Sequence, residues 1–314
     1  MATLPAIDQS TPITPSGKQD FLTLMDLPAD ALKAIVADAI ELRRAYERGE
    51  RTPVLAGRTA ALILELNSTR TRVGFEAGMQ QLGGQCLIID AKNSQLGRGE
   101  PICDTARVLS EMLDVIVIRT LEQAKVQELA RWASVPVINA MTAQFHPLQL
   151  LADIQTFEEL RGSIEGAKVA FIGDGYNMCH SYLNASRQWN FDLQLACPDG
   201  YRPDPGVFER CERAVFAESV EAAVSNADLV VTDVWSSMGH EADAAAREAA
   251  FSGYQVTEAL LDRAKPEVLF MHCLPAHRGE EVNETILDDP RSVVFREAGN
   301  RLHSQKALLK YLLT

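Results

Sequence analysis

The sequence predicts an α/β fold of two domains, each a mostly parallel sheet flanked by helices. Short apolar runs recur along the chain, and stretches of helical periodicity separate most of them. The runs are continuously apolar rather than alternating, which is typical of parallel strands that helices cover on both faces. At 314 residues, the chain is long enough for two domains of ordinary size.

The apolar runs predict two groups of strands, one before residue 140 and one after residue 165, at 61–64, 86–89, 115–118, 135–138, 169–172, 193–196, 229–232, 268–271 and 293–295. Helices are predicted at 27–48, 105–113, 121–132, 148–160, 220–225 and 302–313, with Asn300 as the N-cap of the last. We place the first domain at 1–145 and the second at 146–299. The helix at 148–160 bridges them, and residues 300–314 are expected to pack back on the first domain.

The composition is that of a soluble globular protein, with 46% hydrophobic and 23% charged residues. The net charge of −13 argues against a nucleic-acid partner, which would favour a basic face. No apolar run approaches the roughly 20 residues of a membrane span, and the N-terminus has no signal-peptide pattern. The cysteines lack a C-x-x-C pair and are expected to be reduced, so we expect a cytoplasmic protein without a membrane partner.

Ser68-Thr69-Arg70-Thr71-Arg72 follows the first apolar run and opens a helical stretch. A helix that begins at Ser or Thr presents unpaired backbone N–H groups and the positive end of its dipole. Arginines in a first turn oppose that dipole unless an anion lies between them. An N-cap followed by solvated arginines is the alternative. We favour an anion site, with phosphate as first candidate, because arginine binds oxyanions bidentately.

Six polar clusters follow predicted strands, and ligands of open parallel sheets bind at the carboxyl ends of the strands. We therefore expect one active-site cleft shared by the two domains. The clusters begin at Ser68, Arg119, His146, Gly173, Asp233 and His272.

In the first half, three further residues are candidates for the site. Arg119 closes an apolar strand and is either a second clamp for the anion or the partner of a nearby aspartate. His146 could polarise a carbonyl group, transfer a proton or simply begin a helix before Pro147. Gln149 lies on the same helix face, so the two side chains could hold a carbonyl oxygen and an NH₂ group.

In the second half, Gly173-Asp174-Gly175 lacks the third glycine of a dinucleotide-binding fingerprint. Asn177 is then a polar substrate contact at a helix start. Asp233 is the candidate to bind a cationic amine, with an N-cap or turn role as the alternative. Arg301 near the C-terminus repeats the pattern of an arginine in a first helical turn, although a surface position is the stronger alternative there.

The segment at 272–275 presents several polar groups to the expected cleft. Cys273 and His272 point to opposite faces of an extended segment, which argues against a covalent cysteine mechanism. Pro275 could form a cis peptide bond that exposes backbone carbonyls. The histidines lack metal-binding spacing, so no metal is expected.

Five segments match motifs of one enzyme family: S-T-R-T-R at 68–72, F-H-P-L-Q at 145–149, D-V-W-S-S-M-G at 233–239, H-C-L-P-A-H-R-G-E-E-V at 272–282 and E-A-G-N-R-L-H-S-Q-K-A at 297–307. The chain thus resembles the aspartate/ornithine carbamoyltransferase family over about three quarters of its length. The S-M-G and H-C-L-P segments point to the ornithine branch.

The resemblance implies transfer of the carbamoyl group of carbamoyl phosphate to the side-chain amine of L-ornithine, giving L-citrulline and phosphate without a cofactor. It implies that 1–145 binds carbamoyl phosphate and 146–299 binds ornithine. Family members are usually trimers, so a homotrimer or a multiple of trimers is expected, in which Gln95 reaches a neighbouring subunit's site.

The resemblance also implies a role for each site residue. Phosphate would be held by Ser68, Thr69, Arg70 and Thr71 with Arg119, and the carbonyl oxygen by Thr71, Arg119 and His146. The carbamoyl NH₂ would be held by Gln149, Arg301 and the backbone carbonyls of Cys273 and Leu274. Ornithine would contact Asn177, Asp233, Ser237 and Met238. The implied catalytic residues are Arg119, His146, Asp233 and Cys273.

Leu66, Gln144 and Tyr176 depart from the family's pattern, which bears on kinetics and amine specificity. Two alternatives stay open at this stage. One is a carbamoyltransferase for another amine, such as putrescine, an N-acylated ornithine or aspartate. The other is a non-catalytic small-molecule-binding relative; a dehydrogenase ranks third. The sequence leaves the direction of the reaction, allostery and the exact oligomer open.

Overall fold

The computed structural model describes residues 17–90, 99–236 and 244–314. Two separate parallel sheets form the protein, as the sequence predicts. The first, in the order β2-β1-β3-β4, consists of β1 (Thr59–Leu64), β2 (Gln85–Asp90), β3 (Val115–Arg119) and β4 (Val137–Met141). The second, in the order β7-β6-β5-β8-β9, consists of β5 (Lys168–Ile172), β6 (Asp192–Ala196), β7 (Ala214–Phe216), β8 (Leu229–Thr232) and β9 (Leu269–His272).

Helices cover both faces of each sheet. Around the first sheet lie α1 (Ala29–Glu47) and α2 (Thr69–Gln81) on one face and α3 (Ile102–Ser110) and α4 (Gln123–Trp132) on the other. Around the second lie α5 (Pro147–Arg161) and α6 (Asn177–Trp189) on one face and α8 (Val220–Val224) and α10 (Glu258–Leu261) on the other. The remaining elements are α7 (Pro205–Phe208), α9 (Ala244–Phe251), the 3₁₀ turn η4 (Ile286–Asp288) and α11 (Val294–Leu313). Among the described residues, no helix is long and apolar enough to cross a membrane.

The central strands, such as β1 and β3, are continuously apolar because both of their faces are buried. In β1, Ala60 and Leu62 pack in one apolar cluster, whereas Ala61 and Ile63 pack in another on the opposite face. Successive side chains of a strand point to opposite faces, so a strand covered on both sides needs apolar residues at every position.

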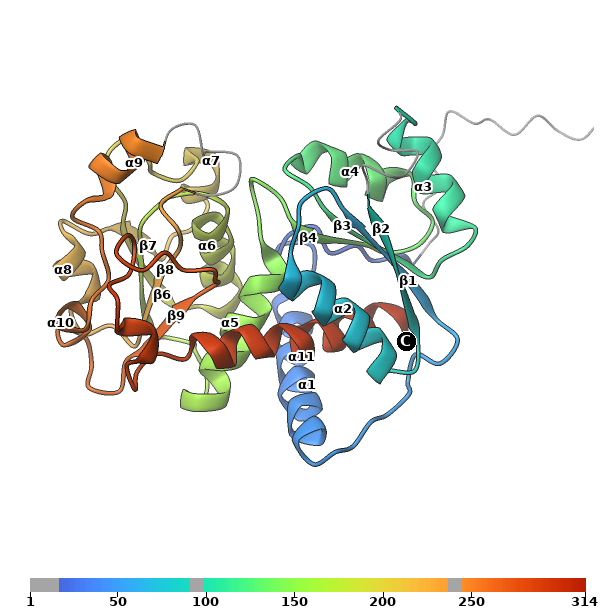
Figure 1. Ribbon diagram of the computed structural model, residues 1–314, viewed down its shortest axis with the longest axis horizontal. Coiled ribbons are helices and arrows are strands. Elements are labelled where there is room, and N and C mark those ends of the chain that lie inside the picture. The colour runs from blue at the N-terminus through green and yellow to red at the C-terminus, as the bar shows by residue number, and fades with distance from the viewer. Residues whose placement is uncertain (1–16, 91–98, 237–243) are drawn as a thin grey trace, which may run out of the picture.

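One apolar core runs through both domains. It joins residues of the first sheet, such as Leu62, to residues of the second, such as Phe171, by way of α1, α5 and the end of α11. Figure 1 shows α5 between the two lobes and α11 passing beneath both, from the β9 side to α2. Helix α11 also packs against α1 and α5, so the last helix ties the two lobes together.

One prediction about a strand and one about a helix are wrong. Residues 293–295 are not a strand, because α11 begins at Val294. Strand β7 was not predicted at all. Three apolar residues in a row fit a strand or a helix equally well. Asn300 is not an N-cap but lies in the middle of α11, where partners on α5 and α1 satisfy its amide.

The strand registers bring the polar clusters together. Leu64 at the end of β1 is level with Arg119 at the end of β3, and Thr232 at the end of β8 is level with His272 at the end of β9. The residues that follow these strands therefore emerge side by side at one edge of each sheet.

Candidate active site

A cavity of about 290 Å³ lies among these strand ends, and residues of both domains line it. Gln95, Ser237 and Met238 fall outside the described residues. Thr69, Thr71 and Gln149 are not among the lining residues. Further lining residues include Leu121, Met141, Tyr176, Ser236 and His277. The predicted site residues that line the cavity are Ser68, Arg70, Arg119, His146, Asn177, Asp233, Cys273, Leu274 and Arg301.

The start of α2 forms one end of the cavity. Ser68 is the N-cap, and its hydroxyl oxygen accepts a hydrogen bond from the backbone N–H of Thr71 at 3.3 Å. The first turn of α2 contains no acidic residue, so no carboxylate within it offsets the positive end of the helix dipole. This helix start suits an anion, as the sequence predicts.

The two arginines of the S-T-R-T-R segment lie in different environments. Arg70 lines the cavity and donates from Nη2 to the backbone oxygen of Leu274, across the cleft. Arg72 is exposed, and its Nε donates to Glu76 Oε2 at 3.1 Å one turn further along α2. Arg70 is therefore the candidate for binding substrate, and Arg72 forms an ordinary surface ion pair.

Arg119 and Arg301 add two more guanidinium groups to the cavity. Arg119 closes β3 with 5% of its surface exposed, and Arg301 on α11 is 2% exposed. Burial, together with repulsion from the neighbouring guanidinium groups, lowers the pKa of Arg119 to about 10 and that of Arg301 to about 9. Three cations that repel one another in a buried pocket favour an anion between them.

His146 lies beside these cations at the start of α5, directly before Pro147. Its backbone N–H donates to Ser181 Oγ at 2.8 Å, whereas its ring Nδ1 is buried and has no hydrogen-bond partner among the described residues. Burial and then repulsion from the three arginines lower the pKa of His146 well below its usual value. The imidazole is therefore neutral at physiological pH.

Gln149 is buried behind Arg301 rather than on the cavity surface. Its Oε1 accepts from Arg301 Nη1 at 2.6 Å, and its Nε2 donates to Asp153 Oδ1 at 2.9 Å and Glu297 Oε1 at 2.8 Å. Both N–H groups of the amide are thus occupied by carboxyl groups. The expected contact of Gln149 with substrate remains a prediction.

Asp233 and Cys273, which follow β8 and β9, also line the cavity. The Cys273 thiol donates to Asp233 Oδ1 at 3.1 Å. Burial, and then the neighbouring Asp233, raise the pKa of Cys273 well above its usual value, so the group is a thiol and not a nucleophilic thiolate. Burial also raises the pKa of Asp233, which is 7% exposed, while hydrogen bonds from Cys273 and Val234 oppose that shift.

The backbone turns sharply after Cys273. Leu274 has a φ of 55°, and the Leu274–Pro275 peptide bond is cis, as the sequence suggested. The Leu274 carbonyl faces Arg70. This segment therefore presents a backbone acceptor to the cavity.

Within the described residues, Asp233, His272 and Cys273 carry possible metal-ligand atoms within 4.8 Å of one another, as do His277, Glu280 and Glu281. In the first group, His272 Nδ1 accepts from the Leu274 N–H at 2.9 Å, and its Nε2 faces Glu281 Oε1 at 3.1 Å. Since Nδ1 accepts, Nε2 is the protonated nitrogen, and the His272 ring has no lone pair to offer a metal.

Two residues outside the cavity lining hold nearby loops in place and were not predicted from the sequence. Arg247 on α9 is buried and donates from Nη1 to Asp174 Oδ2 at 2.6 Å and to the Trp235 carbonyl at 2.8 Å. Nothing in the sequence separates Arg247 from a surface arginine. The second residue is Gly175, where a Cβ atom would collide with the backbone of Pro203, so this glycine allows a close approach of two loops.

Asn177 begins α6 and lines the cavity. Its Nδ2 donates to the Thr142 carbonyl at 2.7 Å, across the boundary between the two sheets. Asn177 is thereby held in place while its side-chain oxygen is available to a ligand.

Two family models cover the chain. The aspartate/ornithine carbamoyltransferase carbamoyl-P binding domain matches residues 19–159, and the Asp/Orn binding domain of the same enzymes matches residues 165–312. The chain is 53% identical over 294 residues to an ornithine carbamoyltransferase of Psychrobacter sp. (strain PRwf-1), an alignment that covers 93% of this chain and 96% of the relative. It is 52% identical over 295 residues to one of Chromohalobacter salexigens, covering 93% and 97%.

Solved structures of ornithine carbamoyltransferases are also similar to this chain. The ornithine carbamoyltransferase from Pyrococcus furiosus superposes with a TM-score of 0.90 at 43% identity, covering 94% of this chain and 97% of that one. The enzyme from Burkholderia thailandensis E264 superposes with a TM-score of 0.87 at 42% identity, covering 94% and 98%. With the two-sheet fold and the strand-end cavity, these matches establish that the chain belongs to the aspartate/ornithine carbamoyltransferase family.

Proposed function

We propose how the two sides of the cavity divide the work of carbamoyl transfer. The chain transfers the carbamoyl group of carbamoyl phosphate to the side-chain amine of L-ornithine, giving L-citrulline and phosphate. One observation carries the division of roles: Arg70, Arg119 and Arg301 line the same cavity as Asp233 and Cys273. A phosphate-bearing substrate suits the first side, and a cationic amine suits the second.

On the cationic side, the phosphate group binds at the start of α2, held by Ser68, Thr69, Arg70 and Thr71, with Arg119 as a further clamp. This assignment is supported by the uncompensated helix start and by the crowding of guanidinium groups. The carbamoyl NH₂ lies toward Arg301, Gln149 and the carbonyls of Cys273 and Leu274.

The amine must lose its proton before it reacts, since a lysine-like amine has a reference pKa of about 10.4. Asp233 attracts the cationic form into the site, and Asn177, Ser237 and Met238 hold the rest of ornithine. The Cys273 thiol, a hydrogen-bond donor to Asp233, fixes the direction of that carboxylate. That first proton is lost to solvent, and the neutral amine then directs its lone pair at the carbamoyl carbon.

In the transfer step, the amine nitrogen forms a bond to the carbamoyl carbon, and the bond from that carbon to the phosphate oxygen breaks. Negative charge develops on the carbonyl oxygen, and donors from Thr71, Arg119 and His146 stabilise it. A neutral His146 donates a hydrogen bond without adding a fourth positive charge to the pocket. The departing phosphate, held by Arg70, accepts the proton released by the amine.

We further propose that residues 1–145 bind carbamoyl phosphate and that residues 146–299 bind ornithine. The enzyme is proposed to be cytoplasmic and to form a homotrimer or a multiple of trimers. In that assembly, Gln95 contributes to the active site of a neighbouring subunit.

We also propose that the enzyme works in the biosynthetic direction, toward arginine. An ornithine carbamoyltransferase from Pseudomonas savastanoi pv. phaseolicola that is named anabolic is 51% identical to this chain over 294 residues.

An amine-specificity assay tests the proposal. The purified enzyme is given carbamoyl phosphate with L-ornithine, putrescine, N-acetylornithine or L-aspartate, and product formation is measured. We expect ornithine to have the highest kcat/KM by at least about 100-fold, because a site built to pair substrate polar groups rejects analogues that leave them unpaired. Higher kcat/KM with putrescine would refute the assignment, and no turnover with any amine would favour a non-catalytic relative.

A further inference from the structure

Behind the cavity, two buried acidic side chains that the reaction does not use lie close together. Asp153 on α5 and Glu297 on α11 are each 1% exposed, and both accept a hydrogen bond from the same nitrogen, Gln149 Nε2, at 2.9 and 2.8 Å. Two buried carboxylates this close repel each other, which disfavours ionisation of both. Consistent with this, burial first and the neighbouring carboxyl next raise the pKa of Glu297 well above its usual value.

Each carboxyl group has two partners, and together these reach both sides of the cavity. Asp153 accepts from Gln149 Nε2 at 2.9 Å and from the Tyr182 hydroxyl at 2.8 Å. Glu297 accepts from Gln149 Nε2 at 2.8 Å and from the backbone N–H of His272 at 3.0 Å.

The two carboxyl groups determine which way the Gln149 amide faces. Both of its N–H groups donate to them, so its oxygen must face away from them, and there it accepts from Arg301 Nη1 at 2.6 Å. If the amide turned around, an oxygen would face two carboxyl oxygens and an NH₂ group would face a guanidinium.

We propose that Asp153 and Glu297 are positioning residues: they orient Arg301 through Gln149 and anchor the Cys273–Leu274 segment through the backbone of His272. The pair thereby sets the distance between Arg301, which faces carbamoyl phosphate, and the Cys273 segment beside Asp233, where the amine binds. This inference rests on the proposed function for its kinetic readout. Its chemistry requires only that the pocket binds carbamoyl phosphate.

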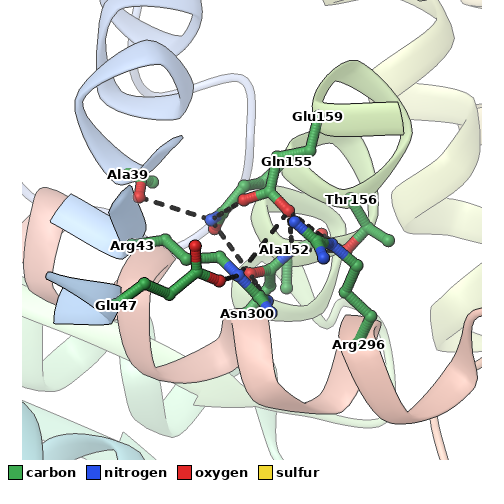
Figure 2. Close-up of polar contacts among 9 residues, drawn as sticks. All are labelled: Ala39, Arg43, Glu47, Ala152, Gln155, Thr156, Glu159, Arg296 and Asn300. Carbon is green, nitrogen blue, oxygen red and sulfur yellow. Dashed lines mark hydrogen bonds and ion pairs between the residues drawn. The ribbon is translucent and has the colours of Figure 1, made fainter. Parts of the chain in front are cut away.

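The same two helices supply a matched control. On the side facing α1, Glu159 accepts from Gln155, Asn300 and Arg296, and Arg43 of α1 donates to Asn300 (Figure 2). The Glu159 side chain is 5% exposed, so this network is also buried between α5 and α11. None of its members lines the cavity.

The experiment compares Glu297→Gln with Glu159→Gln. Both substitutions remove one buried carboxylate from the α5–α11 interface at constant size, so both should lower the melting temperature. We expect only Glu297→Gln to lose kcat/KM for carbamoyl phosphate, by about 10- to 100-fold, because a small displacement of Arg301 and the 272–274 segment misplaces the reacting groups. Equal kinetic effects in the two variants, measured well below their melting temperatures, would overturn the proposal.

A double-mutant cycle tests whether Glu297 acts through Arg301. In an Arg301→Lys background, the further effect of Glu297→Gln on carbamoyl phosphate kcat/KM should shrink to less than about threefold, because coupled residues are not additive. If the two substitutions instead lower kcat/KM by independent factors, Glu297 does not act through Arg301. If Glu297→Gln fails to fold, Glu297→Asp and Glu159→Asp make the same comparison by withdrawing the carboxyl group by one methylene.

Calorimetric titration with carbamoyl phosphate, in the absence of any amine, separates this inference from the proposed ornithine specificity. Carbamoyl phosphate should bind Glu297→Gln about tenfold more weakly than it binds the unaltered enzyme or Glu159→Gln, because its NH₂ group lies against Arg301 and the 272–274 segment. Unchanged affinity for carbamoyl phosphate would defeat the positioning role. Failure of turnover with ornithine would leave the binding result intact and would count against the proposed function alone.

Discussion

The side of the cavity built from α2, β3 and α11 carries three guanidinium groups, whereas the side built from the ends of β8 and β9 carries a carboxylate and a thiol. Both sides follow the same architectural rule, with polar residues placed after parallel strands. They differ in local field: burial and mutual repulsion lower the pKa of Arg119 and Arg301, and burial raises that of Asp233.

The difference teaches that net charge says little about a site. The chain carries a net charge of −13, yet its cavity gathers three cations on one side. A small pocket can present opposite fields to two substrates because Arg70 and Arg119 come from elements of the first sheet's half, whereas Asp233 and Cys273 follow strands of the second sheet. Kinetic parameters for the two substrates should therefore respond separately to changes on the two sides.

The largest effect should come from removing a cation. Arg70→Ala should lower kcat/KM by about 10²–10³-fold, the usual effect of losing a donor that stabilises developing charge. The loss should appear first in KM for carbamoyl phosphate, measured by steady-state kinetics.

Arg72→Ala is the control for Arg70→Ala. Arg72 lies two residues further along α2 in an exposed ion pair with Glu76, which contributes about 0–1 kcal/mol. Its kinetics should stay within about twofold of the unaltered enzyme. Similar losses in both variants would mean that the helix, and not the Arg70 guanidinium, was damaged.

On the other side, Asp233→Asn should lower kcat/KM for ornithine by about 10- to 100-fold, the size of a lost charge-assisted hydrogen bond. KM for carbamoyl phosphate should change little. Asp192→Asn, which removes an exposed carboxylate paired with Arg213, serves as the control. If Asp233→Asn lowered kcat/KM only for carbamoyl phosphate, Asp233 would not belong to the ornithine site.

The last comparison concerns pH, to which the two substrates should respond differently. Between pH 7 and 8.5, kcat/KM for ornithine should rise about tenfold per unit, because the neutral fraction of an amine with a pKa of about 10.4 grows by that factor. KM for carbamoyl phosphate should change by less than about threefold, since the pKa values of Arg301, about 9, and Arg119, about 10, keep both charged there. If the kinetic parameters for both substrates changed with pH in the same way, the two sides of the cavity would not act independently.

The sequence predicts the parallel strands well because burial on both faces leaves a continuous apolar run, as in β1 and β3. It fails at β7, a three-residue edge strand in which Val215 is exposed. It also fails at the start of α11. Asn300 and Arg301 look like a helix start, but in mid-helix their polar groups are satisfied by side chains on other elements, which no local pattern reveals.

For the site, residues directly after strands could be predicted because topology alone brings them together. Arg70 and Arg119 are examples. The placement of Gln149 could not be predicted, since helical spacing puts it near His146 but does not say that two buried carboxyl groups occupy its amide. Arg247 was missed for a similar reason, because its partner Asp174 lies 73 residues away in the chain.

The packing of α11 has a consequence for synthesis of the chain. Ala307, Leu308 and Leu309 belong to the same apolar core as Leu62 of β1, although about 245 residues separate Leu62 from Ala307 in sequence. During translation the amino-terminal domain emerges first, but these core positions are filled only after α11 has been synthesised. Until then, the surfaces of α1 and α2 that pack against α11 lack that partner.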